Sequence, residues 1–323
     1  MKTLLLVMDE QRVILDRLYE AIEENSAHCD ILRLDKAQQF SLAVTLRDAN
    51  YRSYDRVVIF SRLKRLLPQA HVLRSVPGLV FLEHDACQNF MSTSKYKGVY
   101  SRFYKLFPWC RVLSSGSTVA RKLREQGIDA VFVSKGYDQA LMKNLHRKRD
   151  IDVAFIGSIK GGAYAPRAEL LETVAAATNL VITRTSSGQD YVDMLNRVRI
   201  FLSADVDMGE YMIKNFEAMA CGCVLLARSQ GEEEDAAIGF IDGKNAVLYR
   251  TAEEAIKKIA WLGNNPDVAV SIADEGQRFA EERYSFSRVG RDLALAIEAP
   301  MRCRPRMTTL QRLWLRLRYR LVP

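Results

Sequence analysis

The sequence predicts an α/β protein built from two facing Rossmann-like domains, and three observations lead to this fold class. The chain has 323 residues, more than a single hydrophobic core usually holds. Short apolar runs alternate with amphipathic stretches along nearly its whole length, the pattern of parallel sheets covered by helices. A polar, basic stretch at 143–152 separates two such series and is the expected linker.

The first series predicts a parallel sheet of six strands joined by helices. Its apolar runs predict strands at 3–8, 30–34, 56–60, 79–83, 111–115 and 130–134. Helices are expected in the gaps, including 10–24 and 117–126. Ser117 and Thr118 are typical of the start of the second of these helices, and Gly127 is typical of its end.

The second series repeats the alternation after the linker. Strands are predicted at 153–157, 180–183, 199–204, 224–227 and 246–249. Helices are predicted at 166–177, 190–197, 211–220, 252–262 and 266–282. Because parallel α/β sheets bind ligands beyond the carboxyl ends of their strands, we expect the site in a cleft between the two domains.

Charge and motifs exclude several function classes. The net charge is +8, but seven arginines and no acidic residue fall in the last 24 residues, so the rest of the chain is nearly neutral. A nucleic-acid enzyme more often spreads its charge over a groove in the body, so nucleic acid is not an expected partner. The sequence has no G-x-G-x-x-G after its first strand and no Walker A motif, which argues against a dinucleotide dehydrogenase and a P-loop NTPase.

The cysteines and the apolar runs indicate a cytoplasmic protein. The six cysteines form no C-x-x-C pair, and Cys221 and Cys223 flank a glycine with no histidine nearby, a poor zinc site. The apolar run at the N-terminus is too short for a signal peptide. No run approaches the roughly 18 apolar residues of a membrane span.

The segment 199–228 holds the best candidate for a binding site. A buried strand leads to a loop at Gly209, and a helix follows that Gly222 ends. The N–H groups and dipole at the start of this helix can hold a diphosphate. Glu217 lies about two turns further on, where its carboxylate can accept hydrogen bonds from both hydroxyls of a ribose. The alternative is an ordinary solvated helix glutamate.

This segment carries a resemblance to a known family. The run FEAMACGCVLLA, with Gly209 before it and IDGKNAVLY after it, resembles the nucleotide-binding signature of GT-B glycosyltransferases of the group-1, family-4 type. It is particularly similar to the CgeB-like, spore-maturation branch. The resemblance covers roughly 110–290 and includes SSGSTVARKLREQGIDAVFVSKGYD, AFIGSIKGGAYAPRAELL and ERYSF.

The resemblance implies a GT-B fold and an activity. Its expected parts are an N-terminal acceptor-side domain (1–148), a C-terminal nucleotide-sugar domain (149–284), a helix returning to the first domain (285–299) and a basic amphipathic tail (300–323). The implied reaction is hexosyl transfer from a nucleotide sugar without a metal or other cofactor, with retention favoured over inversion. The implied setting is envelope polysaccharide or lipopolysaccharide synthesis.

The resemblance also implies the nucleotide-sugar residues. The second glutamate of the family's Glu-x7-Glu pair falls on Glu217, and the first falls on Gly209, with Glu210 one residue later. The family's arginine, directly after Gly157, is Ser158 here. The available cations are therefore Lys160 and Arg167, either of which can neutralise a leaving phosphate. For Arg167 the alternative is an ordinary surface position.

Two further groups of residues are candidates for catalysis and metal binding. His84 and Asp85 directly follow the strand at 79–83, so a general base or a donor-sugar contact is expected there. The alternative is that His84 bonds its own loop. Asp205 and Asp207 form a D-x-D, which we discount as a metal site because it precedes a helix of the metal-free family.

Two segments suggest an acceptor or a membrane. Basic and aromatic residues interleave at 95–111, where an acceptor or lipid headgroups are favoured over stacked bases. In the tail, an apolar helical stripe carries Trp314, and Arg312 and Arg316 lie opposite; the stripe is formed by Leu310, Leu313, Trp314, Leu317 and Leu321. Such a helix predicts peripheral binding to an anionic membrane on its inner face, and the alternative is a helix docked on the protein itself.

The expected partners are therefore a nucleotide sugar, a glycan or lipid-linked acceptor, and an anionic membrane. Two other functions remain open at this point. One is a nucleotide-sugar epimerase of the same fold. The other is a degenerate protein that binds a glycan or a partner without catalysis.

Overall fold

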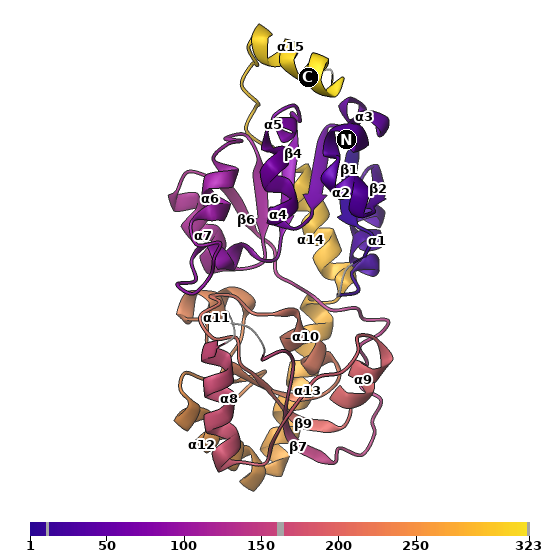
Figure 1. The fold of residues 1–323 in the computed structure, drawn as a ribbon. Coiled ribbons are helices and arrows are strands. Elements are labelled where there is room, and N and C mark those ends of the chain that lie inside the picture. Colours follow the sequence, from indigo (N-terminus) through magenta and orange to yellow (C-terminus); the bar gives the residue numbers. More distant parts are fainter. Residues whose placement is uncertain (11–12, 160–164, 322–323) are drawn as a thin grey trace.

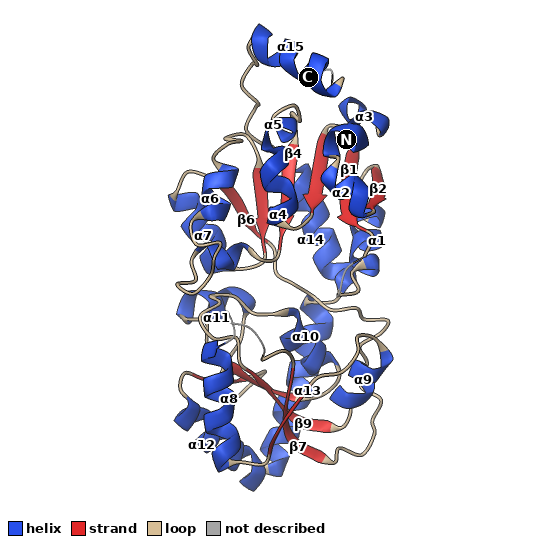
Figure 2. Ribbon diagram, viewed as in Figure 1, coloured by secondary structure: helices blue, strands red, loops and turns tan. Residues whose placement is uncertain are grey.

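The computed structural model describes residues 1–10, 13–159 and 165–321, and its strands form two separate parallel sheets (Figures 1 and 2). The first contains β1 (Thr3–Met8), β2 (Cys29–Leu34), β3 (Arg56–Phe60), β4 (Leu79–Glu83), β5 (Arg111–Ser114) and β6 (Asp129–Phe132), in the order β2-β1-β3-β4-β5-β6. The second contains β7 (Ile151–Ile156), β8 (Leu180–Thr183), β9 (Val198–Ser203), β10 (Val224–Arg228) and β11 (Val247–Tyr249), in the order β11-β10-β9-β7-β8. The predicted fold class, two Rossmann-like domains, is confirmed.

Helices cover both sheets. Those between the strands of the first sheet are α1 (Asp16–Glu24), α2 (Lys36–Phe40), α3 (Leu42–Asp48), α4 (Leu63–Leu66), α5 (Ala70–Leu73), α6 (Val99–Tyr104) and α7 (Ser117–Glu125). Short 3-10 helices are η1 (Tyr51–Ser53), η2 (Leu67–Gln69) and η3 (Ala86–Asn89). Those that follow β7 are α8 (Ala165–Ala177), α9 (Gln189–Leu195), α10 (Ile213–Ala220), α11 (Glu232–Ile238), α12 (Ala252–Asn264), α13 (Pro266–Arg283), α14 (Phe286–Glu298) and α15 (Thr309–Tyr319). In the described residues, no helix has the length and apolar character needed to cross a membrane.

Two predicted helices begin later than expected. The helix predicted at 10–24 begins at Asp16, whose negative charge in the first turn suits the helix dipole. The helix predicted at 211–220 begins at Ile213 because Met212 is extended, with ψ 157°, and its N–H donates to the carboxylate of Asp205. The later start places the N–H groups of α10 directly at the end of the loop after β9.

The chain crosses between the two sheets twice, and the two crossings lie side by side. The N–H of Tyr137 donates to the carbonyl of Tyr284 at 2.8 Å, and the N–H of Phe286 donates back to the carbonyl of Tyr137 at 2.8 Å. The helix α14 then packs along α1, and Gly290 makes this approach possible because an added Cβ would lie 2.5 Å from the Cβ of Ala21. The predicted boundary at 148/149 falls in the loop between β6 and β7.

The C-terminal helix α15 lies at the end of the first domain that faces away from the second sheet (Figure 1). The preceding segment is tied to the body by Arg302, which donates to the carbonyl of Gly127 at 2.8 Å. Leu315 and Leu321 are each 1% exposed, so both are packed against the body. The placement of Leu321 on an exposed stripe is therefore wrong, and Leu315 is the residue that docks the helix.

Candidate functional site

A pocket of about 300 Å³ lies between the two domains. It opens at the carboxyl ends of β7, β8 and β9, where the order of the second sheet reverses between β7 and β9. Gly157 follows β7, Arg184 follows β8 and Asp205 follows β9, and all three line the pocket. Val13 and Ile14 close it from the first domain. Open α/β sheets bind their ligands at such a reversal, so this is the expected place for a ligand.

The helix α10 begins at the wall of this pocket. Met212, Ile213 and Lys214 line it, and the cap residue Met212 provides no side-chain hydrogen bond to the helix. The N–H groups and the positive dipole end of the first turn are therefore directed at the pocket. This arrangement attracts an anion.

Glu217 lies on the same wall, one turn after Lys214. Its side chain lines the pocket, and the residue is only 8% exposed. Burial raises the pKa of Glu217 to about 7, against the opposing effects of the Lys214 ammonium and the Tyr191 hydroxyl. The Lys214 Nζ in turn lies 4.9 Å from the centre of the Tyr191 ring. The predicted ribose-binding carboxylate is thus in the pocket and carries a proton part of the time near neutral pH.

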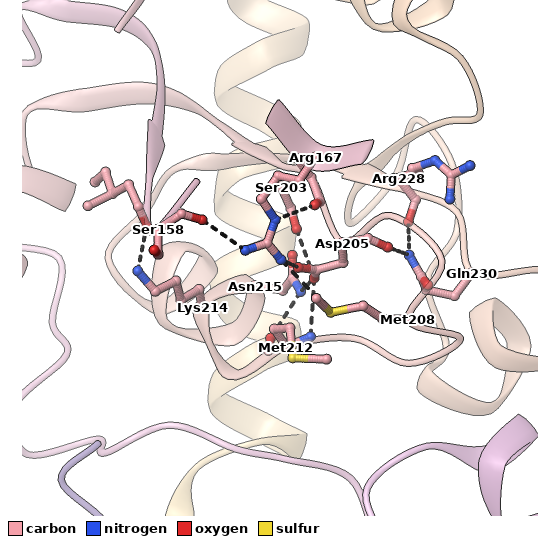
Figure 3. A network of polar contacts seen from close by, with 12 residues as sticks. Ser158, Arg167, Ser203, Asp205, Met208, Met212, Lys214, Asn215, Arg228 and Gln230 are labelled. Atoms are coloured by element: carbon pink, nitrogen blue, oxygen red, sulfur yellow. Dashed lines mark hydrogen bonds and ion pairs between the residues drawn. The ribbon is translucent and has the colours of Figure 1, made fainter. Parts of the chain in front are cut away.

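Arg167 enters the pocket through a network around Asp205 (Figure 3). Its Nε donates to the carbonyl of Ala204 at 2.8 Å, and its Nη2 lies 3.2 Å from Asp205 Oδ1. The other carboxylate oxygen of Asp205 accepts from Ser203 Oγ at 3.0 Å and from Asn215 Nδ2 at 2.8 Å. Asp205 therefore joins the guanidinium to the start of α10.

The second aspartate of the D-x-D is in a different environment. The Asp207 side chain is 59% exposed, and its Oδ1 lies 3.8 Å from a guanidinium nitrogen of Arg228. Asp205 is occupied by protein donors, as described above. Each of the two carboxylates thus has its own protein partner.

Gly209 and Glu210 lie outside this pocket, which differs from the prediction. Gly209 has φ +64° and donates its N–H to Gln230 Oε1 at 2.9 Å. Glu210 is 1% exposed and turns toward the first domain, where its Oε2 lies 3.1 Å from Lys135 Nζ and accepts from Ser115 Oγ at 2.6 Å. A buried carboxylate requires such partners, and this requirement explains its direction.

His84 and Asp85 follow β4 in the first domain, the same domain that contributes Lys135 to the ion pair with Glu210. The His84 ring packs against Phe60 with centroids 5.1 Å apart, and burial, with a smaller effect of the Lys135 charge, lowers the pKa of His84 to about 3. Burial between the domains raises the pKa of Asp85, although its side chain reaches solvent. Among the described residues no hydrogen bond of the His84 ring to its own loop is found. With its pKa of about 3, the His84 imidazole is neutral and a weak base near neutral pH, whereas the raised pKa of Asp85 brings its carboxylate closer to the range of a general base.

Several residues of the site were missed from the sequence. Arg184 directly follows the apolar run of β8, the same sequence signal that selected His84, and Lys214 shares a helix face with Glu217. Glu83 has no such signal; its buried carboxylate accepts from the Tyr104 hydroxyl at 3.0 Å, and burial raises its pKa to about 8. The predicted Lys160 lies outside the described residues.

The aromatic residues at 95–111 do not form a binding surface. Tyr100, Phe103, Tyr104, Phe107 and Trp109 are all buried in the core of the first domain. The prediction of an acceptor or lipid surface there is wrong, because these rings pack against one another and on β4.

Comparisons with known proteins agree with this geometry. Residues 124–294 match a family described as glycosyl transferase-like. No curated protein matches the sequence. The structure is similar to that of Anabaena HepE in complex with UDP and glucose, with a TM-score of 0.68, 13% identity, and 93% of this chain and 100% of that chain covered.

Two further solved structures are similar. Sucrose-phosphate synthase from Thermosynechococcus elongatus gives a TM-score of 0.67 at 10% identity, covering 92% of this chain and 98% of that chain. The β-glucosyltransferase of phage T4, in complex with UDP and Mn²⁺, gives 0.58 at 13% identity, covering 93% of this chain and 100% of that chain. At these identities the likeness shows the shared fold, the GT-B arrangement of two Rossmann-like domains.

Proposed function

This chain belongs to the glycosyl transferase-like family, and from that membership we propose that it transfers a hexose from a uridine diphosphate sugar to a glycan or glycolipid acceptor at a membrane. Within the family we place it nearest the CgeB-like branch, on the FEAMACG run. The observation that carries the proposal is the interdomain pocket, where the start of α10 and the buried Glu217 form one wall. HepE, which has this fold, was solved with UDP-glucose, so we propose UDP-glucose as the first donor to test.

The donor's parts match the groups of this pocket. We place the diphosphate at the N-terminus of α10, between the cationic side chains of Lys214, Arg184 and Arg167. Glu217 accepts hydrogen bonds from the ribose hydroxyls. The negative diphosphate then meets positive groups, and the ribose hydroxyls meet a carboxylate that accepts their hydrogen bonds.

We propose that transfer needs no divalent metal and retains the anomeric configuration. The leaving diphosphate meets fixed positive charge from the helix dipole, Lys214 and Arg184, which stabilises it as it departs, while the charge of Arg167 is balanced by Asp205. Asp205 is bonded to Arg167 and α10 and serves the protein's own structure. Turnover should therefore persist in EDTA, and loss of activity that manganese restores would contradict this part.

The tail supports a membrane setting, peripheral on the cytoplasmic face. Leu310, Leu313 and Leu317 on α15 are 79%, 50% and 75% exposed, while Leu315 holds the helix on the body. Arg312 and Arg316 are also exposed. The half-exposed Trp314 packs edge-on against His71 with centroids 5.3 Å apart. An exposed apolar stripe edged by arginines suits an anionic lipid surface.

Two measurements test the proposal. UDP or UDP-glucose at about 100 times its dissociation constant should stabilise the protein by roughly 2.7 kcal/mol in a thermal-shift assay. Release of UDP from UDP-glucose should then depend on added acceptor. An epimerase would convert the donor without releasing UDP, and a binding protein would leave it unchanged, so either result would replace the transferase assignment.

A further inference from the structure

We call the interdomain pocket, in which we place the nucleotide sugar, the donor pocket. The first sheet has a pocket at the position that corresponds to the donor pocket at the second sheet. Its order reverses between β1 and β3, just as the second sheet reverses between β7 and β9. A pocket of about 420 Å³ lies there. Met8 ends β1 and residues 9–10 follow it, residues 35–37 follow β2, and Arg62 and Arg65 follow β3. The rule that places a ligand in the second domain therefore also places one here.

Part of the charge in this pocket is already satisfied by the protein. Lys36 Nζ lies 3.1 Å from Glu10 Oε2. Asp35 caps α2 by accepting the N–H of Gln38 at 2.8 Å. The Lys36–Glu10 pair therefore adds no net charge, whereas Asp35 keeps its negative charge next to the positive dipole end of α2.

The other charged groups of the pocket are Asp9 and two guanidinium groups. Arg65 lies flat over the Phe40 ring, 3.8 Å from its centre, and this stacking leaves the N–H edge of the guanidinium for a ligand. Arg62 is exposed and makes no ion pair with any described residue. Asp9 is exposed beside them and can accept hydrogen bonds from hydroxyl groups. Two arginine forks and one carboxylate suit an oxyanion attached to a polyol.

The pocket is adjacent to both parts of the proposed reaction site. Residues 8–10 line it, and Val13 and Ile14, a few positions later in the sequence, line the donor pocket. Arg62 also lies within electrostatic reach of Asp85: burial raises the pKa of that carboxyl, and the Arg62 charge opposes the rise. A ligand bound here is therefore next to the donor pocket and to the proposed base.

We infer that this second pocket holds the acceptor, and that the acceptor is an acidic saccharide whose carboxylate or phosphate binds Arg62 and Arg65. The inference rests on the proposed transferase function and adds the chemical class of its second substrate. Asp9 binds hydroxyl groups of the same saccharide.

The test measures saccharide binding directly. Glucuronate, glucose 6-phosphate and neutral glucose are titrated into the full-length protein by saturation-transfer NMR, with UDP present to fill the donor pocket. Arg62→Ala is compared with Lys64→Ala, which removes an exposed cation of α4 that does not line the pocket. We expect the two acidic sugars to bind more tightly than glucose. Arg62→Ala should weaken them about tenfold or more, as for the loss of a charged hydrogen bond, whereas Lys64→Ala should not.

The outcomes separate this inference from the proposed function. Equal binding of glucose and the acidic sugars, no saccharide binding, or no effect of Arg62→Ala would each overturn the acidic-acceptor assignment. A preference for glucuronate over glucose 6-phosphate, or the reverse, identifies the anion. UDP binding is measured on the same samples by thermal shift, and its absence in the wild type would defeat the transferase proposal itself.

Discussion

Glu217 is the residue on which nucleotide binding should depend most directly. Its carboxylate is buried in the donor pocket, and we place the ribose against it. Glu217→Ala should weaken UDP binding by about 1.5–3 kcal/mol, the range for hydrogen bonds to a charged group. Isothermal titration measures this, and unchanged affinity in a folded variant would remove Glu217 from the site.

The raised pKa of Glu217 allows a second test, which examines the burial of its carboxylate in the ligand-free protein and does not depend on nucleotide binding. Between the ordinary glutamate value of 4.5 and about 7, the folded protein keeps this proton while the unfolded chain loses it. The stability contributed by the protonated form is therefore lost as pH rises through that window. In the ligand-free protein, Glu217→Gln should gain stability relative to the wild type between pH 5 and pH 8, which urea unfolding at both values measures. A difference that does not change with pH would show that Glu217 is already ionised when buried.

His84 and Asp85 should be needed for turnover and not for donor binding. They follow β4 in the first domain, whereas the residues that we propose for nucleotide binding come from the second. Replacing both by alanine should lower kcat by about 10²–10⁴-fold, the usual effect of losing a general base, with UDP affinity unchanged. His146→Asn, in the exposed linker, is the control, because asparagine tolerates its positive φ of 51°. Full turnover in the double variant would show that the base lies elsewhere.

At the scale of elements, buried polar contacts join the two domains. The carboxylate of Glu234 on α11 accepts the N–H of Thr118 at the start of α7, at 2.8 Å. Burial raises the pKa of Glu234 to about 7, which the Thr118 N–H opposes. Nearby, Lys135 and Glu210 form their ion pair across the same boundary. These contacts fix the relative position of the donor pocket and the His84 side of the cleft.

The ion pair predicts a particular pattern of stabilities. Lys135→Met leaves the Glu210 carboxylate buried without its cation, which should cost about 3–5 kcal/mol of unfolding free energy. The double variant Lys135→Met, Glu210→Gln should recover part of this loss, because the uncompensated charge is gone. Urea unfolding of the two single variants and the double variant measures the coupling. Additive single effects would mean that the two side chains do not depend on each other.

The sequence predicted the elements well where one local signal decides them. The apolar runs located all eleven strands found in the described residues, and the FEAMACG run placed Glu217 on the wall of the pocket. Rules about strand ends are also local, so His84 was found, and Arg184 could have been found in the same way.

The contacts that the sequence did not reveal join distant segments. Nothing near Lys135 or Glu210 indicates that they meet, because 75 residues separate them and the pairing depends on how the domains close. The surface predicted at 95–111 was wrong for a related reason, because burial of its aromatic residues also depends on distant segments. Their alternation with basic residues resembles a surface, and only packing against β4 shows that most of the rings are core, while the lysines and Arg102 are exposed and Arg111 is buried.

For the whole molecule, we propose that the position of α15 sets how the protein meets a membrane. The helix lies at the far end of the first domain, away from the second sheet (Figure 1). Its docking residue Leu315 is buried, as is Leu321 just after the helix, and the exposed leucines of α15 are separate from them. Membrane contact and folding can therefore be tested with different substitutions.

We predict that Leu310→Ser, Leu313→Ser and Leu317→Ser together abolish binding to anionic liposomes and leave the melting temperature unchanged. These side chains are exposed, so their loss costs little folding energy, yet they form the face that would enter the lipid. Val270→Ser, at an exposed position of α13, is the control for loss of apolar surface. Replacing Arg312 and Arg316 by glutamine should instead reduce the free energy of binding to anionic liposomes by about 1 kcal/mol per charge. That loss should be largest at low salt, because the Debye length is about 10 Å at 0.1 M. The leucine variant should also transfer more slowly to a lipid-linked acceptor than the wild type, while its rate with a short soluble acceptor stays the same, because the cleft is at the other end of the domain. Undiminished flotation of the leucine variant would show that α15 is not the anchor, and a lowered melting temperature would mean that its outer face packs on the protein.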